Sequence, residues 1–170
     1  MRCNFPDMHD NTLFPMRRRD FLRLGAGAAA LTLVPSALEA WAAPAEFPLM
    51  TIYKSETCLC CEKWVDHVKA AGFKTAVHNL DPMDPLKDQL AIPRHVRSCH
   101  TAQIGGYLVE GHVPATDIKR LLKEKPKIMG LSVPGMPVGT PGMDQPGVPA
   151  EPYHVVAFQK AGTTSVYAKY

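Results

Sequence analysis

Residues 50–72 read MTIYKSETCLCCEKWVDHVKAAG and hold three cysteines within four positions. The run Leu49–Lys54 alternates apolar and polar residues and is rich in strand formers, which predicts a first strand. Residues 62–71 repeat apolar side chains at helical spacing, which predicts a helix that Gly72 ends. The three thiols, those of Cys58, Cys60 and Cys61, therefore lie in the loop between a strand and a helix.

The alternation of strands and helices continues to residue 125. The patterns predict a second strand over 73–80, a short helix over 84–90, two short strands over 101–113 about the turn Gly105-Gly106, and a helix over 114–125 with Pro114 at its start. The order β-α-β-α-β-β-α is that of a thioredoxin or glutaredoxin core spanning residues 49–125. The predicted fold class is therefore α/β.

Residues 126–170 are predicted to extend this core. Residues 126–152 are dense in proline and glycine, which predicts a loop, and they repeat Pro-Gly-Met at 134–136 and 141–143. Residues 153–158 and 164–170 are typical of two strands that close the chain as a β-hairpin. We expect one thioredoxin-like domain over residues 43–170, with a Pro/Gly/Met-rich loop and a hairpin outside its core.

The N-terminal 42 residues have the three parts of a secretory signal. A basic start precedes an apolar run over 24–38, and small residues at Ala40 and Ala42 make cleavage after Ala42 plausible. The pair Arg18-Arg19 adds a twin-arginine signature, which is typical of a bacterial route that exports folded proteins. We therefore expect residues 1–42 to be an N-terminal extension and a twin-arginine-type signal peptide, and the mature domain to be periplasmic.

The composition excludes two classes of partner. The 170 residues are 46% hydrophobic and 21% charged, with a net charge of +3, as in an ordinary globular protein. No basic run with interleaved aromatic residues follows the N-terminus, so we expect no nucleic-acid partner. The apolar run of the signal is short for a membrane span, so we expect no membrane contact after its removal.

The mature chain keeps four cysteines. Cys58 and Cys61 have the C-x-x-C spacing of a redox loop, and Cys60 is added between them. Cys99 precedes the third predicted strand, at the place where a glutaredoxin core normally has a cis-proline that packs against the redox loop. The predicted fold therefore brings four thiols together, which is more than a dithiol switch needs.

Such a cluster suits a soft metal. Thiolates with thioether or imidazole partners bind Cu(I), zinc and iron–sulfur clusters. In Cys-x-Cys-Cys the neighbouring sulfurs diverge, so four of them would close on one tetrahedral zinc only with strain. Thiolates that bridge several Cu(I) ions are geometrically easier, and a methionine-rich loop favours copper further. The candidate metal ligands are Cys58, Cys60, Cys61, Cys99, His100, His112, Met136 and Met143.

Some of these residues have a structural interpretation as well. Met136 and Met143 are also compatible with loop packing, and His112 with organising the turn before the last helix. Trp64 is predicted to anchor the core, and His67 is predicted to lie on the exposed side of its helix.

Three long segments carry a resemblance to a known family. Residues 53–73 (YKSETCLCCEKWVDHVKAAGF), 98–122 (SCHTAQIGGYLVEGHVPATDIKRLL) and 130–143 (GLSVPGMPVGTPGM) resemble the CopG-like family of small exported bacterial metal-binding proteins. The resemblance implies a thioredoxin-like fold and copper handling in the periplasm. It also implies that Cys58, Cys60, Cys61 and Cys99, with His100 beside them, hold a cysteine-bridged, multinuclear Cu(I) site. Leu59 departs from the family pattern, in which glycine is frequent.

The sequence is also compatible with two other functions. The C-x-x-C spacing at a helix start is also typical of a thiol–disulfide oxidoreductase, and the thiols could instead form a zinc-stabilised binding module. No acid–base pattern demands an enzyme, although redox activity toward copper is conceivable. The expected partners are copper ions and other periplasmic copper-handling proteins.

Overall fold

The computed structural model describes residues 46–170, which belong to one compact unit. The predicted signal peptide, residues 1–42, lies outside the described residues. Within residues 46–170 no helix combines the length and the apolar character needed to cross a membrane.

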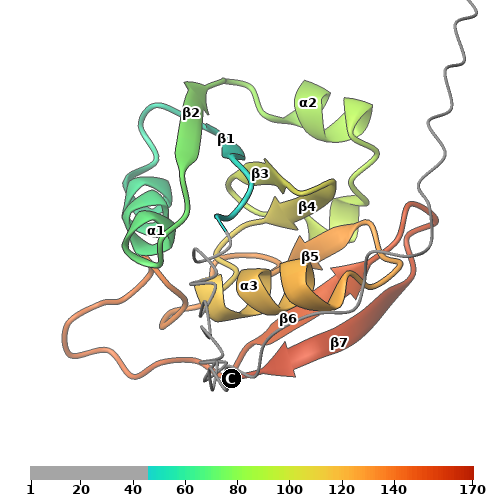
Figure 1. Cartoon of the computed structure of the whole chain (residues 1–170). Helices are drawn as coiled ribbons and strands as arrows, with labels where there is room; N and C mark the ends of the chain where they lie inside the picture. The colour runs from blue at the N-terminus through green and yellow to red at the C-terminus, as the bar shows by residue number, and fades with distance from the viewer. Residues whose placement is uncertain (1–45) are drawn as a thin grey trace, which may run out of the picture. The chain divides into compact units, whose positions relative to one another are not determined.

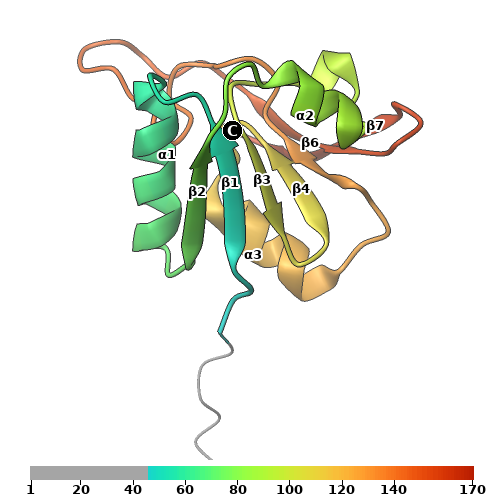
Figure 2. The ribbon, with the colours of Figure 1, turned by 90° about the horizontal axis from the view of Figure 1, so that it is seen from above.

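A single mixed sheet forms the centre of the fold, with the strand order β2-β1-β3-β4-β5-β6-β7. Figures 1 and 2 show it from two directions. Its strands are β1 (Met50–Lys54), β2 (Thr75–Asn79), β3 (Thr101–Ile104), β4 (Tyr107–Glu110), β5 (Gly130–Ser132), β6 (His154–Phe158) and β7 (Thr164–Lys169). The pairs β1/β2 and β4/β5 are parallel, and the other neighbours are antiparallel.

Helices pack on both faces of the sheet. The larger core joins the apolar sides of α1 (Leu59–Ala70) and α3 (Ala115–Glu124) to one face. The smaller core, on the other face, contains Leu90 and Ile92, which follow α2 (Asp84–Gln89), and Val96 of the 3-10 turn η1 (Arg94–Val96). Neighbouring residues of a strand point to opposite faces of the sheet. Val109 therefore faces the larger core, whereas its neighbour Leu108 faces the smaller core.

Most predicted elements are confirmed within one or two residues. The first helix, however, begins at Leu59 rather than at residue 62, so that Cys58 is its N-cap residue, without a side-chain capping bond, and Cys60 and Cys61 lie in its first turn. The predicted core order and the closing hairpin β6/β7 are both present.

The prediction of a loop throughout 126–152 is wrong at Gly130–Ser132, which form β5 parallel to β4. Glycine normally weakens a strand, which is why the pattern was typical of a loop. Here the bare glycine is required, because a Cβ at Gly130 would lie only 2.1 Å from the carbonyl oxygen of Leu108.

The pairing of β1 with β3 sets the place of the site. These strands are antiparallel, with Tyr53 opposite Thr101, so the end of β1 lies beside the start of β3. The cysteine loop that follows β1 and the segment that precedes β3 are therefore neighbours in space, although about forty residues separate them in the sequence.

Candidate metal centre

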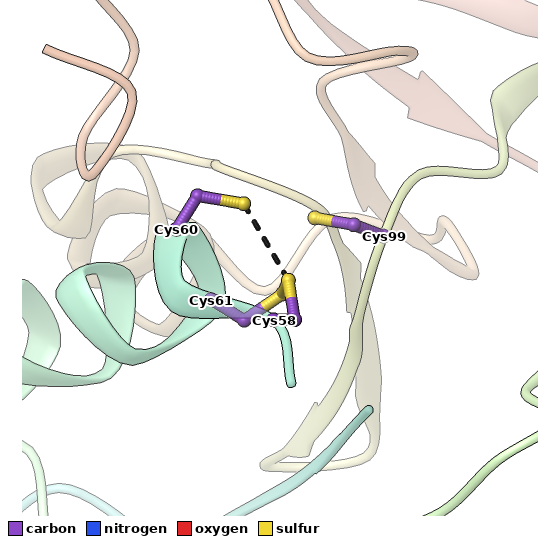
Figure 3. A group of neighbouring side chains, drawn as sticks. All are labelled: Cys58, Cys60, Cys61 and Cys99. Carbon is purple, nitrogen blue, oxygen red and sulfur yellow. Dashed lines mark hydrogen bonds between the residues drawn. A yellow bond between two sulfur atoms is a disulfide. The ribbon is translucent and has the colours of Figure 1, made fainter. Parts of the chain in front are cut away.

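Three cysteines lie at the N-terminus of α1. Cys58 is the N-cap residue, Cys60 and Cys61 follow in the first turn, and Cys61 is completely buried. Cys58 and Cys61 form a disulfide, whereas Cys60 is a free thiol with its Sγ 3.4 Å from the Sγ of Cys58. Figure 3 shows the disulfide and the neighbouring thiol at the end of the helix.

Cys99 approaches the same place from the segment before β3. Its thiol is free, and Figure 3 shows its side chain directed toward the cysteines of α1. The sulfur atoms of Cys58, Cys60, Cys61 and Cys99 all lie within 4.8 Å of one another. The predicted convergence of four sulfurs is therefore present in the fold.

Two histidines extend the cluster on the side of Cys99. The Sγ of Cys99 lies 3.3 Å from Nδ1 of His100 and 3.1 Å from Nε2 of His112, and both imidazoles are fully buried. The Nδ1–H of His112 donates to the carbonyl of Pro141 at 2.8 Å, which leaves its Nε2 lone pair directed at the sulfur. A second group of possible metal ligands thus consists of Cys99, His100 and His112.

The electrostatics keep these three side chains neutral without a metal. Burial, followed by the nearby Cys60, raises the pKa of the Cys99 thiol to about 12. Burial also holds the pKa of His100 well below 6.5 and lowers the pKa of His112. Neutral imidazoles are the form that binds metals, whereas the thiol of Cys99 has to lose its proton first.

Trp64 packs against the ring of His100, and it also lies in the larger core as predicted. Its side chain is fully buried, and its Nε1–H donates to the carbonyl of Val113 at 2.9 Å. The ring centroids of Trp64 and His100 lie 4.3 Å apart. The Nε2 atom of His100 is buried and has no hydrogen-bond partner in the described part of the chain.

The Pro/Gly/Met-rich loop comes close to the centre. Figure 1 shows the chain after β5 passing beside α1 before it returns to β6. The carbonyl oxygen of Pro141 accepts the hydrogen bond from Nδ1–H of His112, and Gly142 lies so close to α1 that a Cβ there would be 2.8 Å from the carbonyl oxygen of Cys60. Met136 is exposed and follows Gly135, whose carbonyl accepts the hydroxyl of Ser98. Met143 is half-buried and follows Gly142.

The prediction for His67 is wrong, because this side chain is half-buried and joins two helices. Its Nε2 accepts the backbone N–H of Ala115 at the start of α3, at 3.1 Å. The helical pattern of α1 could not show this, since the partner lies 48 residues further along the chain.

Sequence reasoning also missed a buried ion pair beneath the site. Lys87 of α2 and Glu110 of β4 are 3% and 0% exposed, and they contact each other as well as Ser98 before and Thr101 after the Cys99-His100 pair. Neither residue belongs to a recognisable motif, and only their burial in the fold identifies them.

The donor set is soft. Sulfur and imidazole donors within this spacing can hold Cu(I), zinc or an iron–sulfur cluster, whereas hard cations such as Mg²⁺ prefer oxygen. With the Cys58–Cys61 disulfide formed, two sulfurs are unavailable as thiolates. The full four-sulfur donor set therefore requires the reduced protein.

Comparisons with known proteins agree with this class of site. A family model described as "Protein of unknown function, DUF411" matches residues 96–143, which contain Cys99 and both histidines. No curated protein matches the chain. Two solved structures do, under the titles "Copper resistance protein copG- Form 2" and "Copper resistance protein copG- Form 1".

Both solved structures are similar to about three quarters of this chain. Each is 42% identical and covers 74% of this chain, and the matches span 99% and 98% of those chains with TM-scores of 0.69 and 0.68. The fold and its sulfur-rich centre define a small α/β protein with a candidate site for a soft metal. Within that class, the chain belongs to the family of the copper resistance protein CopG.

Proposed function

We propose that this protein binds copper in the periplasm and serves in copper resistance. In this proposal Cys58, Cys60, Cys61 and Cys99 bridge several Cu(I) ions as thiolates. The observation that carries it is the approach of all four sulfurs to within 4.8 Å of one another. Soft sulfur donors favour Cu(I), and bridging lets each thiolate serve more than one ion.

The histidines and methionines complete the proposed donor set. His100 and His112 reach Cys99 from inside the fold, so they would bind the copper ions on that side. Met136 and Met143 lie on the loop that contacts His112 and α1, from which thioethers could reach the outer ions. Copper is the cargo of such a site, and loading it requires the Cys58–Cys61 disulfide to be reduced by two electrons.

We propose further that the core is thioredoxin-like and that the protein is exported by the twin-arginine route. The support for the fold is the order β-α-β-α-β-β-α, the sheet order β2-β1-β3-β4 within residues 50–124, and a C-x-x-C disulfide at the start of α1. The support for export is the basic and apolar pattern of residues 1–42 with Arg18-Arg19.

A competitive titration tests the copper proposal. The reduced, metal-free protein would be titrated anaerobically with Cu(I) in the presence of a chromophoric Cu(I) chelator, and separately with zinc. We expect several Cu(I) ions per chain, bound in preference to zinc. Background binding of Cu(I), or a single zinc ion that copper does not displace, would refute the proposal.

The Cys58–Cys61 disulfide favours one second candidate, a thiol–disulfide oxidoreductase. Such an enzyme would reduce insulin disulfides, and it would form a trapped mixed disulfide when Cys61 is replaced by serine. The absence of both would remove this candidate.

A further inference from the structure

The buried pair Lys87 and Glu110 is placed directly behind the segment that carries Cys99 and His100. Lys87 comes from α2, and Glu110 is the last residue of β4. Figure 2 shows α2 beside the ends of the central strands. Both charged groups are almost completely withdrawn from solvent, with exposed side-chain fractions of 3% and 0%.

The contacts of the pair converge on the residues that flank the two donors. Glu110 accepts the backbone N–H of Ser98 at 2.7 Å on Oε1 and the hydroxyl of Thr101 at 2.7 Å on Oε2. Lys87 donates to the carbonyl of Ser98 and to the hydroxyl oxygen of Thr101, both at 3.0 Å. The ion pair therefore holds the backbone immediately before Cys99 and the side chain immediately after His100.

Stability alone gives little reason for an ion pair here. Two buried charges lose their hydration, and well-packed apolar residues of similar volume are often as stable or more stable. An apolar pair would, however, leave the N–H and carbonyl of Ser98 without these partners, and such groups are costly when buried. The charged pair fixes the orientation of this segment, which a nonpolar contact does not.

We propose that Lys87 and Glu110 are positioning residues for Cys99 and His100. They hold the sulfur and imidazole donors within reach of the α1 thiols, and they do not touch the metal themselves. This inference rests on the proposed function, because it assumes that Cys99 and His100 bind copper. It predicts that a substitution which breaks the Lys87–Glu110 contact weakens Cu(I) binding more than a substitution elsewhere that lowers folding stability equally.

The test compares matched variants of the full-length, reduced protein. Glu110→Gln removes the charge at nearly unchanged shape. Thr101→Val removes the hydroxyl between Lys87 and Glu110, and Thr101→Ser keeps it. Asp117→Asn is the control, because Asp117 is a buried carboxylate that bonds Arg120 of α3 and the hydroxyl of Tyr170, which follows β7, away from the thiols. Cu(I) affinity and urea unfolding are measured for each.

We expect Glu110→Gln to lose about 10–100-fold in Cu(I) affinity, the usual effect of removing a group that orients a metal ligand. Thr101→Val should lose affinity and Thr101→Ser should keep it, whereas Asp117→Asn should lose stability alone. Unchanged affinity in Glu110→Gln would overturn the inference. So would an equal loss in Asp117→Asn at equal destabilisation, because the effect would then be general.

A second readout needs no copper and separates this inference from the proposed function. The metal-free protein is treated with iodoacetamide, and Cys99 is followed in the tryptic peptide 98–119, where it is the only cysteine. Cys99 should react several-fold faster in Glu110→Gln than in the wild type, and at the wild-type rate in Asp117→Asn. If the wild type binds no copper, the proposed function fails and this rate alone decides the positioning role. Equal rates in all three proteins would overturn it.

Discussion

At the scale of single residues, Cys60 is the position that separates a copper site from a dithiol switch. Cys58 and Cys61 already form the disulfide that a redox enzyme needs, and Cys60 remains a free thiol 3.4 Å from Cys58. A dithiol mechanism has no use for this additional sulfur. A bridged copper site needs it, because each thiolate links two or more ions.

Replacing Cys60 with serine should therefore lower the copper content of the reduced protein by at least about one ion per chain, because a hydroxyl is a poor ligand for Cu(I). Metal analysis after anaerobic loading measures the change. Leu59→Ser is the matched control, since Leu59 lies between Cys58 and Cys60 and is 75% exposed. Full copper content in Cys60→Ser would contradict the bridged site, as would an equal loss in the control.

The residues of the site differ in how far the sequence reveals them. The cysteines were predictable because their spacing is local and the β-α-β order brings Cys99 toward them. The contact of His67 was not predictable, because its partner Ala115 lies 48 residues away in the sequence. The pair Lys87–Glu110 was not predictable either, because its two residues lie 23 positions apart. Such contacts depend on how helices pack, which short sequence patterns do not encode.

At the scale of elements, the loop between β5 and β6 is packed against α1 through Gly142. This glycine has a φ of +87°, and a Cβ there would lie 2.8 Å from the carbonyl oxygen of Cys60 and 2.8 Å from the backbone nitrogen of Trp64. The loop can thus approach the cysteine turn only because residue 142 has no side chain.

Gly142→Ala should destabilise the protein by about 2–4 kcal/mol, through backbone strain and a clash with α1. Gly147→Ala is the control: Gly147 has a φ of +80°, but nothing lies within 4 Å of its would-be Cβ. It should lose only about 1–2 kcal/mol. Urea unfolding measures both, and equal losses would show that the loop does not depend on this contact.

The link between α1 and α3 should make stability depend on pH. Burial lowers the pKa of His67 below 6.5, against a smaller opposing effect of Asp144, so the unfolded chain binds a proton more readily than the folded one. The free energy of unfolding of the metal-free protein should therefore fall as the pH drops below 6.5, toward the lowered pKa. His100 and His112 act in the same direction.

His67→Gln should make this pH dependence shallower, because glutamine can accept the N–H of Ala115 and does not titrate. Urea unfolding of the metal-free protein at several pH values between 7.5 and 5 measures the slope for both proteins. An unchanged slope would mean that His67 has the same pKa in the folded and the unfolded chain, so that it does not contribute to the pH dependence.

At the scale of the whole molecule, the sheet brings the two halves of the site together. The antiparallel pairing of β1 and β3 places the cysteine turn and the Cys99 segment at one end of the sheet. The order of strands and helices along the core was predictable from periodicity, but β5 was not. Gly130 and its neighbours look like a loop in the sequence, and only the close approach to Leu108 explains the glycine.

Because the sulfurs come from two separate segments of the chain, bound metal should raise the free energy of unfolding. Cu(I) should stabilise the reduced protein against unfolding, by about 2.7 kcal/mol for each single ion bound at a free concentration of one hundred times its Kd, since only the folded chain assembles the site. Thermal unfolding with and without Cu(I) measures this effect. Cys99→Ser should lose most of it, and equal stabilisation of that variant would contradict a site shared by both segments.

The central claim is that all four cysteines hold copper together, and metal content with a thiol count tests it most directly. The protein would be isolated from copper-supplemented cells under reducing, anaerobic conditions, and copper and reactive thiols would be counted in the same sample. We predict several copper ions per chain, with Cys58, Cys60, Cys61 and Cys99 all protected from alkylation. A protein without copper, in which Cys58 and Cys61 form a disulfide and Cys60 and Cys99 react freely, would contradict the account.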